Sequence, residues 1–535
     1  MLTENLSKIS QPKRRAIIRI ALVGVCLCAF MLRVWGLERT SMTNTDEALF
    51  ALEANSFSKM PALVFSFLRD RPLDAQSGRE FIRKHFPEGF LPTVSAKPGF
   101  IFPAVAAIWV SPEAYEEFAI LLLSVLAGTL AVFAAYLLTK ELTGSDIAGV
   151  GAALLLAFSP YHIFYSRLAF PQALAAACVA FGAWAYCRSF RADHKTVFRW
   201  LFAAGFLLGY AFTTHYNVTP LAALWLSFEA VFALKKQRVD LWGRLGVFAA
   251  GFAMPPIFWQ VVLWFKGLVM SAYGSLGFHQ SYFAEYWSIV GGYAPPPTLR
   301  GADFYLEMLR YLDGPFFALT AVAVCAAWFS LRGTRKAPHA FLWCMVVGFF
   351  CLYSVIALRA TRTMVIILPL LASLIAIGAY RIFGLLRNRT GQLAAFCAIV
   401  AVIAVSHTGV IRTILQLKSG YAEAAEAFFE LPGNTVPVGS PWAVFQWKAR
   451  SRVYSTDDKP LRTGEGTYFI ADGLTIQYPE DYAYAKTHTP ILTFKNPMLA
   501  FYPYARDFLV TWSGEEVKNL LKTDQGFGEI RIYKL

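Results

Sequence analysis

Runs of about twenty mostly apolar residues recur along the chain from residue 16 to residue 411. A helix needs roughly 20 such residues to cross the hydrocarbon core of a bilayer. The apolar residues are continuous within the runs and do not follow the spacing of an amphipathic helix. The candidate spans lie at about 16–36, 119–139, 147–164, 171–189, 198–214, 218–234, 244–265, 315–331, 340–358, 363–380 and 391–411. The sequence therefore predicts an all-α polytopic membrane domain with about eleven transmembrane helices.

Charge supports the same class and sets an orientation. Only 16% of the 535 residues are charged, whereas a soluble protein usually carries about a quarter. The net charge of +14 would suggest nucleic-acid binding in a soluble protein. Here the basic residues occupy every second connection between the runs, as the positive-inside rule requires of cytoplasmic loops. We therefore expect no nucleic-acid partner and a cytoplasmic N-terminus. The expected location of the protein is a bacterial inner membrane.

Two long polar regions interrupt or follow the runs. The first, residues 37–118, is a predicted outer loop, and its apolar segment 99–112 is too short to cross and suits a juxtamembrane or re-entrant helix. The second, residues 412–535, alternates short β-like runs with helical stretches. We predict a transmembrane catalytic domain over 1–411 and a small α/β domain over 412–535 on the outer face. Strands are expected at 467–471, 491–494 and 529–533, and helices at 421–431 and 515–521.

An acidic pair, Asp46 and Glu47, follows the first span directly. Ionisable groups close to the bilayer are costly and by default suggest function. Two adjacent carboxylates can supply a general base or bind a divalent cation. They can also mark the start of a helix, with Thr45 as N-cap and the acids in the first turn. Both interpretations can hold together, because a cap can orient a base.

Four basic residues stand where the charge rule disfavours them or beside the short apolar segment. Lys97 opens that segment, Arg167 lies in a predicted outer turn, and Arg359 and Arg362 lie in another. Their position calls for an anionic partner, either lipid headgroups or the phosphate of a lipid substrate. Further candidate substrate contacts are Tyr165, Gln172, His215 and His279.

Three motifs occur in one order: Asp46-Glu47, then Ala96-Lys97-Pro98, then Phe164-Tyr165-Ser166-Arg167-Leu168-Ala169-Phe170-Pro171. Over about residues 16–410 the chain thereby resembles the GT-C class of membrane glycosyltransferases. The branch it resembles includes the protein O-mannosyltransferases and the lipid A aminoarabinose transferase. The order and common sidedness of the motifs, more than any single one, carry the resemblance.

The resemblance implies transfer of a hexose or pentose from a polyprenyl phosphate to a glycan, glycolipid or protein hydroxyl on the outer face. Asp46 matches the acid of the first loop, Lys97 the lysine of a Lys-Pro-Pro pattern, and Arg167 the arginine of the Ser-Arg turn. Gly99 replaces the second proline, and Gln172 stands where the family often has an acid, which weakens any metal site there.

The mechanism we expect is an inverting transfer in which Asp46 accepts the proton of the acceptor hydroxyl and Glu47 orients the acceptor or tunes Asp46. Four cations would stabilise charge on the leaving phosphate: Lys97, Arg167, Arg359 and Arg362. The sequence predicts no cofactor, and it leaves open whether the reaction requires a divalent cation. The alternative is a non-enzymatic carrier or flippase of lipid-linked sugars or other amphipathic anions, which should show internal inverted repeats.

Overall fold

The structure is a computed structural model that describes residues 11–70, 97–235, 241–272, 301–314, 336–355, 360–384, 389–432, 437–439, 441–449, 468–509 and 512–535. The chain forms two compact units, each built from three separate stretches of sequence. The first unit contains Met1–Trp35, Ser124–Phe258 and Gly292–Leu415. The second contains Gly36–Leu123, Trp259–Gly291 and Gln416–Leu535.

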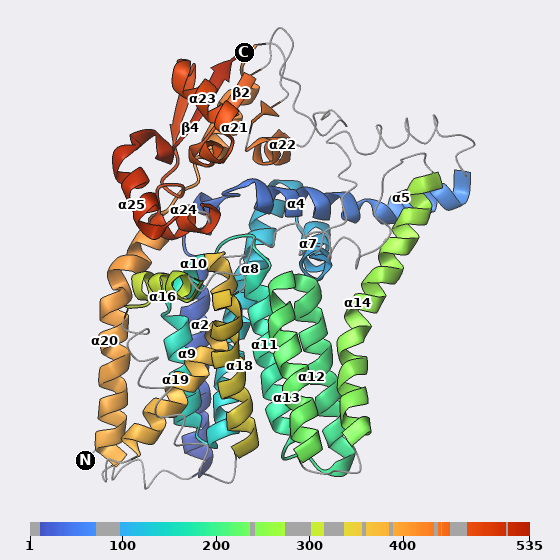
Figure 1. The fold of residues 1–535 in the computed structure, drawn as a ribbon, viewed down its shortest axis with the longest axis vertical. Helices are drawn as coiled ribbons and strands as arrows, with labels where there is room; N and C mark the ends of the chain where they lie inside the picture. Colours follow the sequence, from blue (N-terminus) through green and yellow to red (C-terminus); the bar gives the residue numbers. More distant parts are fainter. Residues whose placement is uncertain are drawn as a thin grey trace. The chain divides into compact units, whose positions relative to one another are not determined.

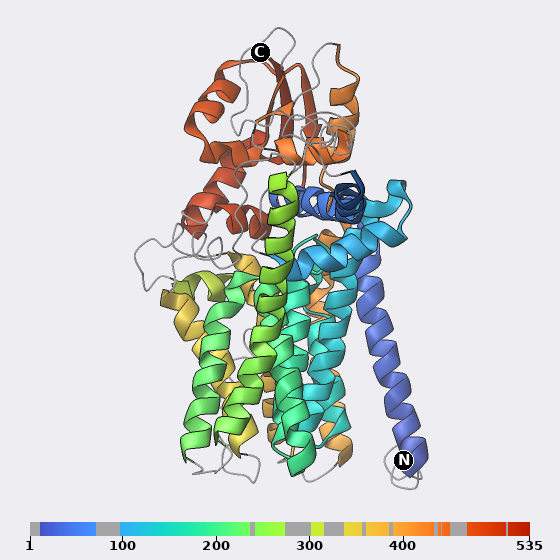
Figure 2. The same cartoon turned by 90° about the vertical axis from the view of Figure 1, so that its right-hand side faces the viewer.

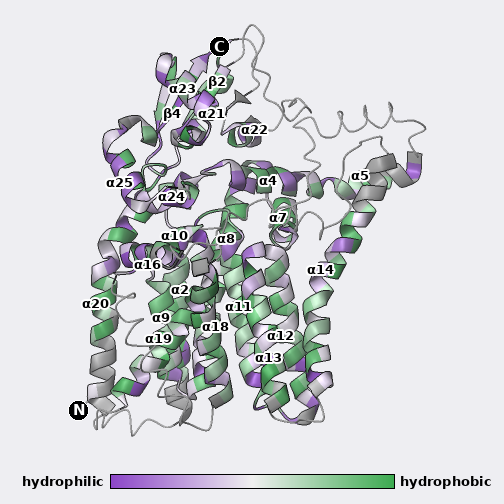
Figure 3. Cartoon of the chain, viewed as in Figure 1, coloured by the Kyte–Doolittle hydropathy of each residue, from purple (hydrophilic) through white to green (hydrophobic). Residues whose placement is uncertain are grey.

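The first unit is a bundle whose long helices run roughly along one direction (Figures 1 and 2). Its helices include α2 (Gln11–Val34), α8 (Glu116–Thr143), α9 (Asp146–Ala157), α10 (Pro160–Tyr165), α11 (Gln172–Ser189), α12 (His194–Thr214), α13 (Thr219–Lys235), α14 (Leu241–Ala272), α16 (Gly301–Leu312), α18 (Lys336–Val355), α19 (Leu368–Phe383) and α20 (Arg389–Gln416), with the 3-10 helices η2 (Tyr216–Val218) and η3 (Thr361–Ile366). Hydrophobic residues dominate most of these helices, as expected of elements in contact with lipid (Figure 3).

Small residues let α12 and α14 pack backbone to backbone. A Cβ atom added at Gly209 would lie 2.1 Å from the carbonyl oxygen of Phe252, and one at Gly251 would lie 2.4 Å from that of Phe202. In lipid, where helices gain little from hydrophobic burial against each other, such close approach provides the packing. The two glycines therefore explain why this helix pair forms.

The predicted membrane character is supported, but the predicted number of spans is not confirmed. Within the described ranges, four helices are long and apolar enough to cross a membrane: Ala16–Thr40, Glu113–Thr143, Lys195–Thr214 and Trp242–Phe265. Shorter apolar helices are Pro98–Val110, Asp146–Ala157, Ala337–Tyr353 and Leu368–Phe383. The predicted span 315–331 lies outside the described residues. The chain is an integral membrane protein.

The predicted span 147–164 is not one helix. Helix α9 ends at Ala157, and α10 begins at Pro160 after Ser159, whose hydroxyl accepts the backbone N–H of His162 at 3.2 Å. Proline lacks a backbone donor and suits the first turn of a helix, and serine is a favoured N-cap. The Ser-Pro pair therefore ends one helix and starts another.

The second unit joins the first loop to the C-terminal segment. The loop contributes α3 (Leu37–Thr40), α4 (Thr45–Ser58), α5 (Met60–Asp70), α7 (Pro98–Val110) and η1 (Glu113–Tyr115). The C-terminal segment contributes α21 (Tyr421–Phe429), β1 (Pro437–Val438), α22 (Trp442–Ala449), β2 (Tyr468–Ala471), η4 (Gly473–Gln477), α23 (Pro479–Thr487), β3 (Leu492–Lys495), α24 (Tyr502–Phe508), α25 (Gly514–Thr523), η5 (Gln525–Gly528) and β4 (Glu529–Lys534). Helix α4 packs against both α7 and α22.

A four-stranded sheet of order β1-β2-β4-β3 organises the C-terminal segment. Strands β1 and β2 are parallel, and β4 is antiparallel to both β2 and β3. Phe469 pairs with Tyr533 in the register, and the two side chains pack with Ala471 in a small core. The predicted α/β character of this segment is thus confirmed, with strands and helices close to the expected positions. The division into domains at residue 411 stays a prediction.

Candidate functional site

The acidic pair opens helix α4, as the helix-start interpretation predicts, but the capping residue is different. Asn44, not Thr45, is the N-cap: its Oδ1 accepts the backbone N–H of Glu47 at 3.0 Å. Asparagine is among the strongest N-cap residues, whereas the side chain of Thr45 already belongs to the first turn. Asp46 and Glu47 therefore both lie in the first turn, where the helix dipole favours negative charge.

The two acids have different surroundings. Glu47 is fully buried, its Oε2 accepts the backbone N–H of Thr43 at 2.8 Å, and its Oε1 accepts the Thr43 hydroxyl at 3.0 Å. Burial raises the pKa of Glu47 from 4.5 to about 8, against the opposing effect of the two Thr43 hydrogen bonds. Asp46 is half-buried. Glu47 is thus built into the loop that precedes α4, and Asp46 is the less buried member of the pair.

Lys97 lies beside the same helix. Its ammonium is 4.2 Å from the centroid of the Phe50 ring, and that ring meets Phe100 of α7 edge to face at 6.0 Å. Phe50 follows Asp46 by four residues, so both side chains lie on one face of α4. Within the second unit, Lys97 therefore contacts α4 at Phe50, one helical turn after Asp46.

The Ser-Arg turn, through Arg167, caps the C-terminal end of helix α2. Arg167 is 1% exposed, and its Nη1 donates to the carbonyl oxygens of Arg33 at 2.9 Å and Trp35 at 2.6 Å. The last carbonyls of a helix lack intrahelical partners, and a cation there also complements the helix dipole. Phosphate binding by Arg167 stays a prediction, and the contacts seen are those of a C-terminal helix cap.

Replacing Arg167 by glutamine is expected to lower the free energy of unfolding by about 1.5–3 kcal/mol, because hydrogen bonds from a charged donor to two buried carbonyls are lost. Thermal unfolding of the detergent-solubilised protein measures this. A variant with unchanged stability and weakened donor binding would instead assign Arg167 to the phosphate.

A second buried arginine, Arg33, was not singled out from the sequence. It donates to the carbonyl oxygens of Ala29 at 2.8 Å and Leu156 at 3.2 Å, and to Nδ1 of His162 at 2.8 Å. The hydroxyl of Ser166 in turn donates to the carbonyl oxygen of His162 at 2.5 Å. An arginine within an apolar run is the signal that sequence reasoning passed over. This network fixes the Ser-Arg turn against α2 and α9.

Helix η3 presents Arg362. The hydroxyl of Tyr161 donates to the carbonyl oxygen of Thr361 at 2.6 Å, and the hydroxyl of Tyr165 contacts that of Thr361. Arg362 is half-buried, with its guanidinium carbon 4.7 Å from the centroid of the Phe170 ring. The structure thus brings Tyr165 and Arg362 onto neighbouring elements, with Tyr165 holding η3 and Arg362 lying against the Ser-Arg turn.

Gln172 and His215 differ in how their polar atoms are used. Gln172 is the first residue of α11 and is 1% exposed, and neither its Oε1 nor its Nε2 has a hydrogen-bond partner in the described part of the chain. An unsatisfied buried amide is costly, which favours a bound polar molecule at this position. His215 accepts the backbone N–H of Asn217 at 3.1 Å through Nδ1, so it stabilises the turn between α12 and α13.

Two predicted site residues, Arg359 and His279, lie outside the described residues. Where the chain is described, no group of three or more histidine, cysteine or acidic side chains has an arrangement that could hold a metal ion.

Asp313, which follows α16, was not predicted: it accepts the Ser159 hydroxyl at 2.5 Å and the Tyr161 backbone N–H at 3.3 Å. It thereby secures the first turn of α10.

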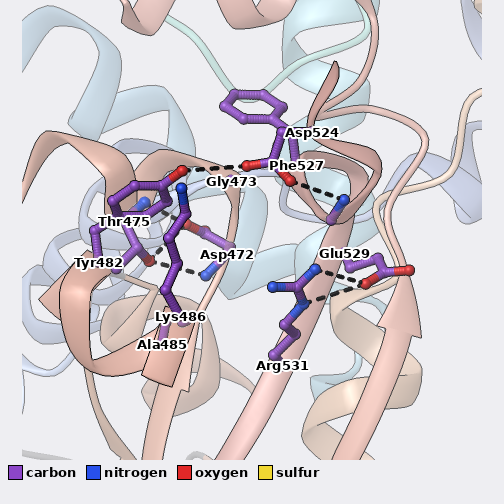
Figure 4. Close-up of a pocket in the computed structure, with 12 residues that line it drawn as sticks. Asp472, Gly473, Thr475, Tyr482, Ala485, Lys486, Asp524, Phe527, Glu529 and Arg531 are labelled. Carbon is purple, nitrogen blue, oxygen red and sulfur yellow. Dashed lines mark hydrogen bonds and ion pairs between the residues drawn. The ribbon is translucent and has the colours of Figure 1, made fainter. Parts of the chain in front are cut away.

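A small pocket of about 60 Å³ lies in the C-terminal segment among η4, α23, η5 and β4 (Figure 4). Its charged groups engage one another or nearby backbone. Asp524 accepts the Tyr482 hydroxyl at 3.3 Å and the Gly526 N–H at 3.0 Å, while Arg531 donates to Glu529 at 3.1 Å. None of the residues predicted for the site lines this pocket.

Comparison with solved structures shows which proteins share this fold. ArnT from Cupriavidus metallidurans, solved with undecaprenyl phosphate, aligns with a TM-score of 0.59 and 14% identity, over 88% of this chain and 95% of that chain. Its apo form gives a TM-score of 0.56 and 13% identity, over 90% and 96% of the two chains. The archaeal oligosaccharyltransferase AglB from Archaeoglobus fulgidus, solved with an inhibitory peptide and a dolichol-phosphate, gives 0.55 and 14%, over 88% and 71%.

The chain therefore has the fold of the GT-C membrane glycosyltransferases, and the resemblance inferred from its motifs is confirmed. Residues 99–264 match the model of the dolichyl-phosphate-mannose-protein mannosyltransferase family. That stretch contains Arg167 and Gln172, but not Asp46 or Lys97. No curated protein matches the sequence.

Proposed function

We propose that this chain is a glycosyltransferase that moves a sugar from a polyprenyl-phosphate donor to an acceptor hydroxyl on the outer face of the membrane. The observation that carries the proposal is the division within the acidic pair. Both oxygens of Glu47 accept hydrogen bonds from Thr43, whereas Asp46 is half-buried in the first turn of α4, one turn before Phe50, which Lys97 contacts. A carboxylate beside a cation is what a base needs next to a departing phosphate.

In the proposed reaction, Asp46 accepts the proton of the acceptor hydroxyl as its oxygen attacks the anomeric carbon. The bond from that carbon to the phosphate oxygen breaks, and its electron pair leaves with the polyprenyl phosphate. Attack opposite to the leaving group inverts the anomeric configuration. Polyprenyl phosphate is already a good leaving group, so the reaction needs no general acid and depends on stabilisation of the phosphate charge.

Within the second unit, we assign that stabilisation to Lys97. The further candidates, Arg167, Arg359 and Arg362, belong to the first unit and stay predictions from the sequence. Lys97 is a compact cation held over an aromatic ring, and Arg362 offers a planar fork that suits phosphate oxygens. The unsatisfied amide of Gln172 is assigned to a polar group of the substrate. ArnT bound to undecaprenyl phosphate and AglB bound to a dolichol-phosphate support a lipid-linked donor.

The proposal is tested by comparing glycolipid and glycoprotein profiles, by mass spectrometry, in a strain that lacks the protein. Complementation with the wild-type chain should restore one glycosylated product, and the chain with Asp46→Asn should not. Purified protein in liposomes should then release free polyprenyl phosphate together with that product. Movement of the lipid-linked sugar between leaflets without any product would replace the enzyme by a carrier.

Replacing Lys97 by methionine should raise the KM for the lipid donor by about 10- to 100-fold, since the apolar stem is kept and one phosphate-binding charge is lost. The acceptor KM should change little. The matched control is Lys59→Met, which removes a lysine at the C-terminal end of α4, about 20 Å along the helix from Asp46. Equal weakening of donor and acceptor would contradict the assignment of Lys97 to the phosphate.

A further inference from the structure

We propose that the C-terminal segment positions the catalytic carboxylate, with Tyr504 and the Glu117–Lys448 ion pair holding the two ends of the loop 41–44 that precedes α4. This inference rests on the proposed function, because it gives a task in that reaction to residues that do not touch substrate. All of the residues concerned belong to the second unit, which includes the first turns of α8 as far as Leu123 and therefore Glu117.

Tyr504 holds the end of the loop that adjoins α4. Its side chain is fully buried, and its hydroxyl donates to the carbonyl oxygen of Thr43 at 2.8 Å. The same hydroxyl accepts Nδ2 of Asn44 at 2.9 Å. Asn44 is the residue whose other amide atom caps α4. One hydroxyl from α24 therefore fixes the orientation of the cap, and the cap fixes the first turn that carries Asp46.

Glu117 holds the other end. Its Oε1 accepts the Ser41 hydroxyl at 2.6 Å and the Met42 backbone N–H at 3.0 Å. Its Oε2 accepts Nε1 of Trp447 at 3.0 Å and Nζ of Lys448 at 2.6 Å. One carboxylate thus joins the loop to α22, because one of its oxygens binds the loop and the other binds α22.

The backbone conformation of Ser41 explains why the loop needs these hydrogen bonds. Its φ of 54° lies in a region that non-glycine residues rarely adopt, and among the described residues it is the only non-glycine with a positive φ. Such a conformation persists only where the surroundings impose it, and it concentrates at functional sites. Here the hydroxyl of Ser41 and the backbone N–H of the next residue, Met42, both donate to Glu117.

The consequence for the reaction is geometric. A base must lie within hydrogen-bond reach of the proton it removes, and a displacement of about 1 Å can cost on the order of 100-fold in rate. Loosening the loop should therefore lower kcat and leave the KM for the donor nearly unchanged, since the phosphate-binding groups are elsewhere. Tyr504, Glu117 and Lys448 are accordingly positioning residues.

The first test compares Tyr504→Phe with Tyr533→Phe. Both changes remove one buried tyrosine hydroxyl from the C-terminal segment, but that of Tyr533 donates to Ala485 and does not touch the loop. We expect Tyr504→Phe to lower kcat by about 10- to 100-fold with donor KM unchanged, and Tyr533→Phe to leave both within about twofold. Hydrogen exchange of the amides at 42–48 should speed up in Tyr504→Phe alone.

The second test uses the two lysine–glutamate pairs of the unit. Lys448 pairs with Glu117 at 2.6 Å, and Lys495 pairs with Glu529 at 2.9 Å, away from the loop. Lys448→Met should lower kcat and speed exchange in the loop, Lys448→Arg should recover most of the loss, and Lys495→Met should do neither. The readouts separate structural destabilisation from positioning, because a merely unstable variant shows faster exchange throughout.

The outcomes distinguish this inference from the function on which it rests. If the wild-type protein transfers sugar and Asp46→Asn abolishes transfer, but Tyr504→Phe matches Tyr533→Phe in kcat and in exchange, the positioning role is overturned and the transferase stands. If exchange changes as expected and no transfer occurs in the wild-type protein, the proposed function fails and the catalytic task of Tyr504 fails with it.

Discussion

Replacing Asp46 by asparagine is expected to reduce sugar transfer by about 10²- to 10⁴-fold, the range in which a general base contributes to catalysis. The change keeps the size and the hydrogen-bonding shape of the side chain while removing its ability to accept a proton. Helix α4 should still form, since its cap is Asn44 and not Asp46. Release of polyprenyl phosphate from a lipid-linked sugar in liposomes, with binding of the donor measured separately, gives the two quantities needed.

The matched control is Glu38→Gln, which neutralises an exposed carboxylate in the same loop region. It should retain wild-type transfer. Donor binding should survive in Asp46→Asn, because the proposed phosphate contacts come from other residues. Undiminished transfer in Asp46→Asn would remove Asp46 from the chemistry, whereas loss of both binding and transfer would point to a role in the donor site.

The second large effect concerns Glu47 and pH. Burial raises the pKa of this carboxyl from 4.5 to about 8 in the folded protein. Between these values the folded chain keeps a proton that the unfolded chain has released, so the free energy of unfolding falls as pH rises through this window. Above about pH 8 the difference is constant. The full span corresponds to at most about 5 kcal/mol.

Glu47→Gln copies the neutral carboxyl and should remove this pH dependence. We expect the thermal midpoint of the wild-type protein to fall between pH 5 and pH 9 by more than that of Glu47→Gln, with Glu38→Gln following the wild type. Identical slopes for the wild type and Glu47→Gln would show that Glu47 is ionised in the folded protein across the whole range.

Much of the fold follows from the sequence because lipid imposes simple rules. The short segment 99–112 and the strands near residues 468, 492 and 529 are local patterns, and each appears near its expected place. Among the described residues, four of the long runs form helices long and apolar enough to cross a membrane. The break inside 147–164 was missed because hydropathy alone dominated, although Ser159-Pro160 carries a known start signal. The association of the first loop with residues 416–535 is not a local property and no periodicity reports it.

The candidate site, like the fold, combines features that are local in the sequence with features that are not. Asp46, Glu47 and Lys97 stand out because charges beside apolar runs are rare. The loop that binds Glu47, however, is held by a residue distant in sequence, because Tyr504 donates to Thr43. Sequence reasoning could propose a phosphate for Arg167, since a surplus cation needs a partner. In the structure, backbone carbonyls at the end of α2 are partners of Arg167. The sequence does not predict this contact, because side-chain patterns carry no information about which carbonyls lack donors.

The grip of α24 and α22 on the loop before α4 has a consequence for how the protein is made. Residues near position 44 are synthesised before the tyrosine that holds them, which follows 460 residues later. Until Tyr504 has been translated, a nascent chain lacks this contact with the loop that carries the cap of α4. Chains that end before Tyr504 should therefore be inactive in the proposed reaction, because Asp46 would lack its fixed geometry.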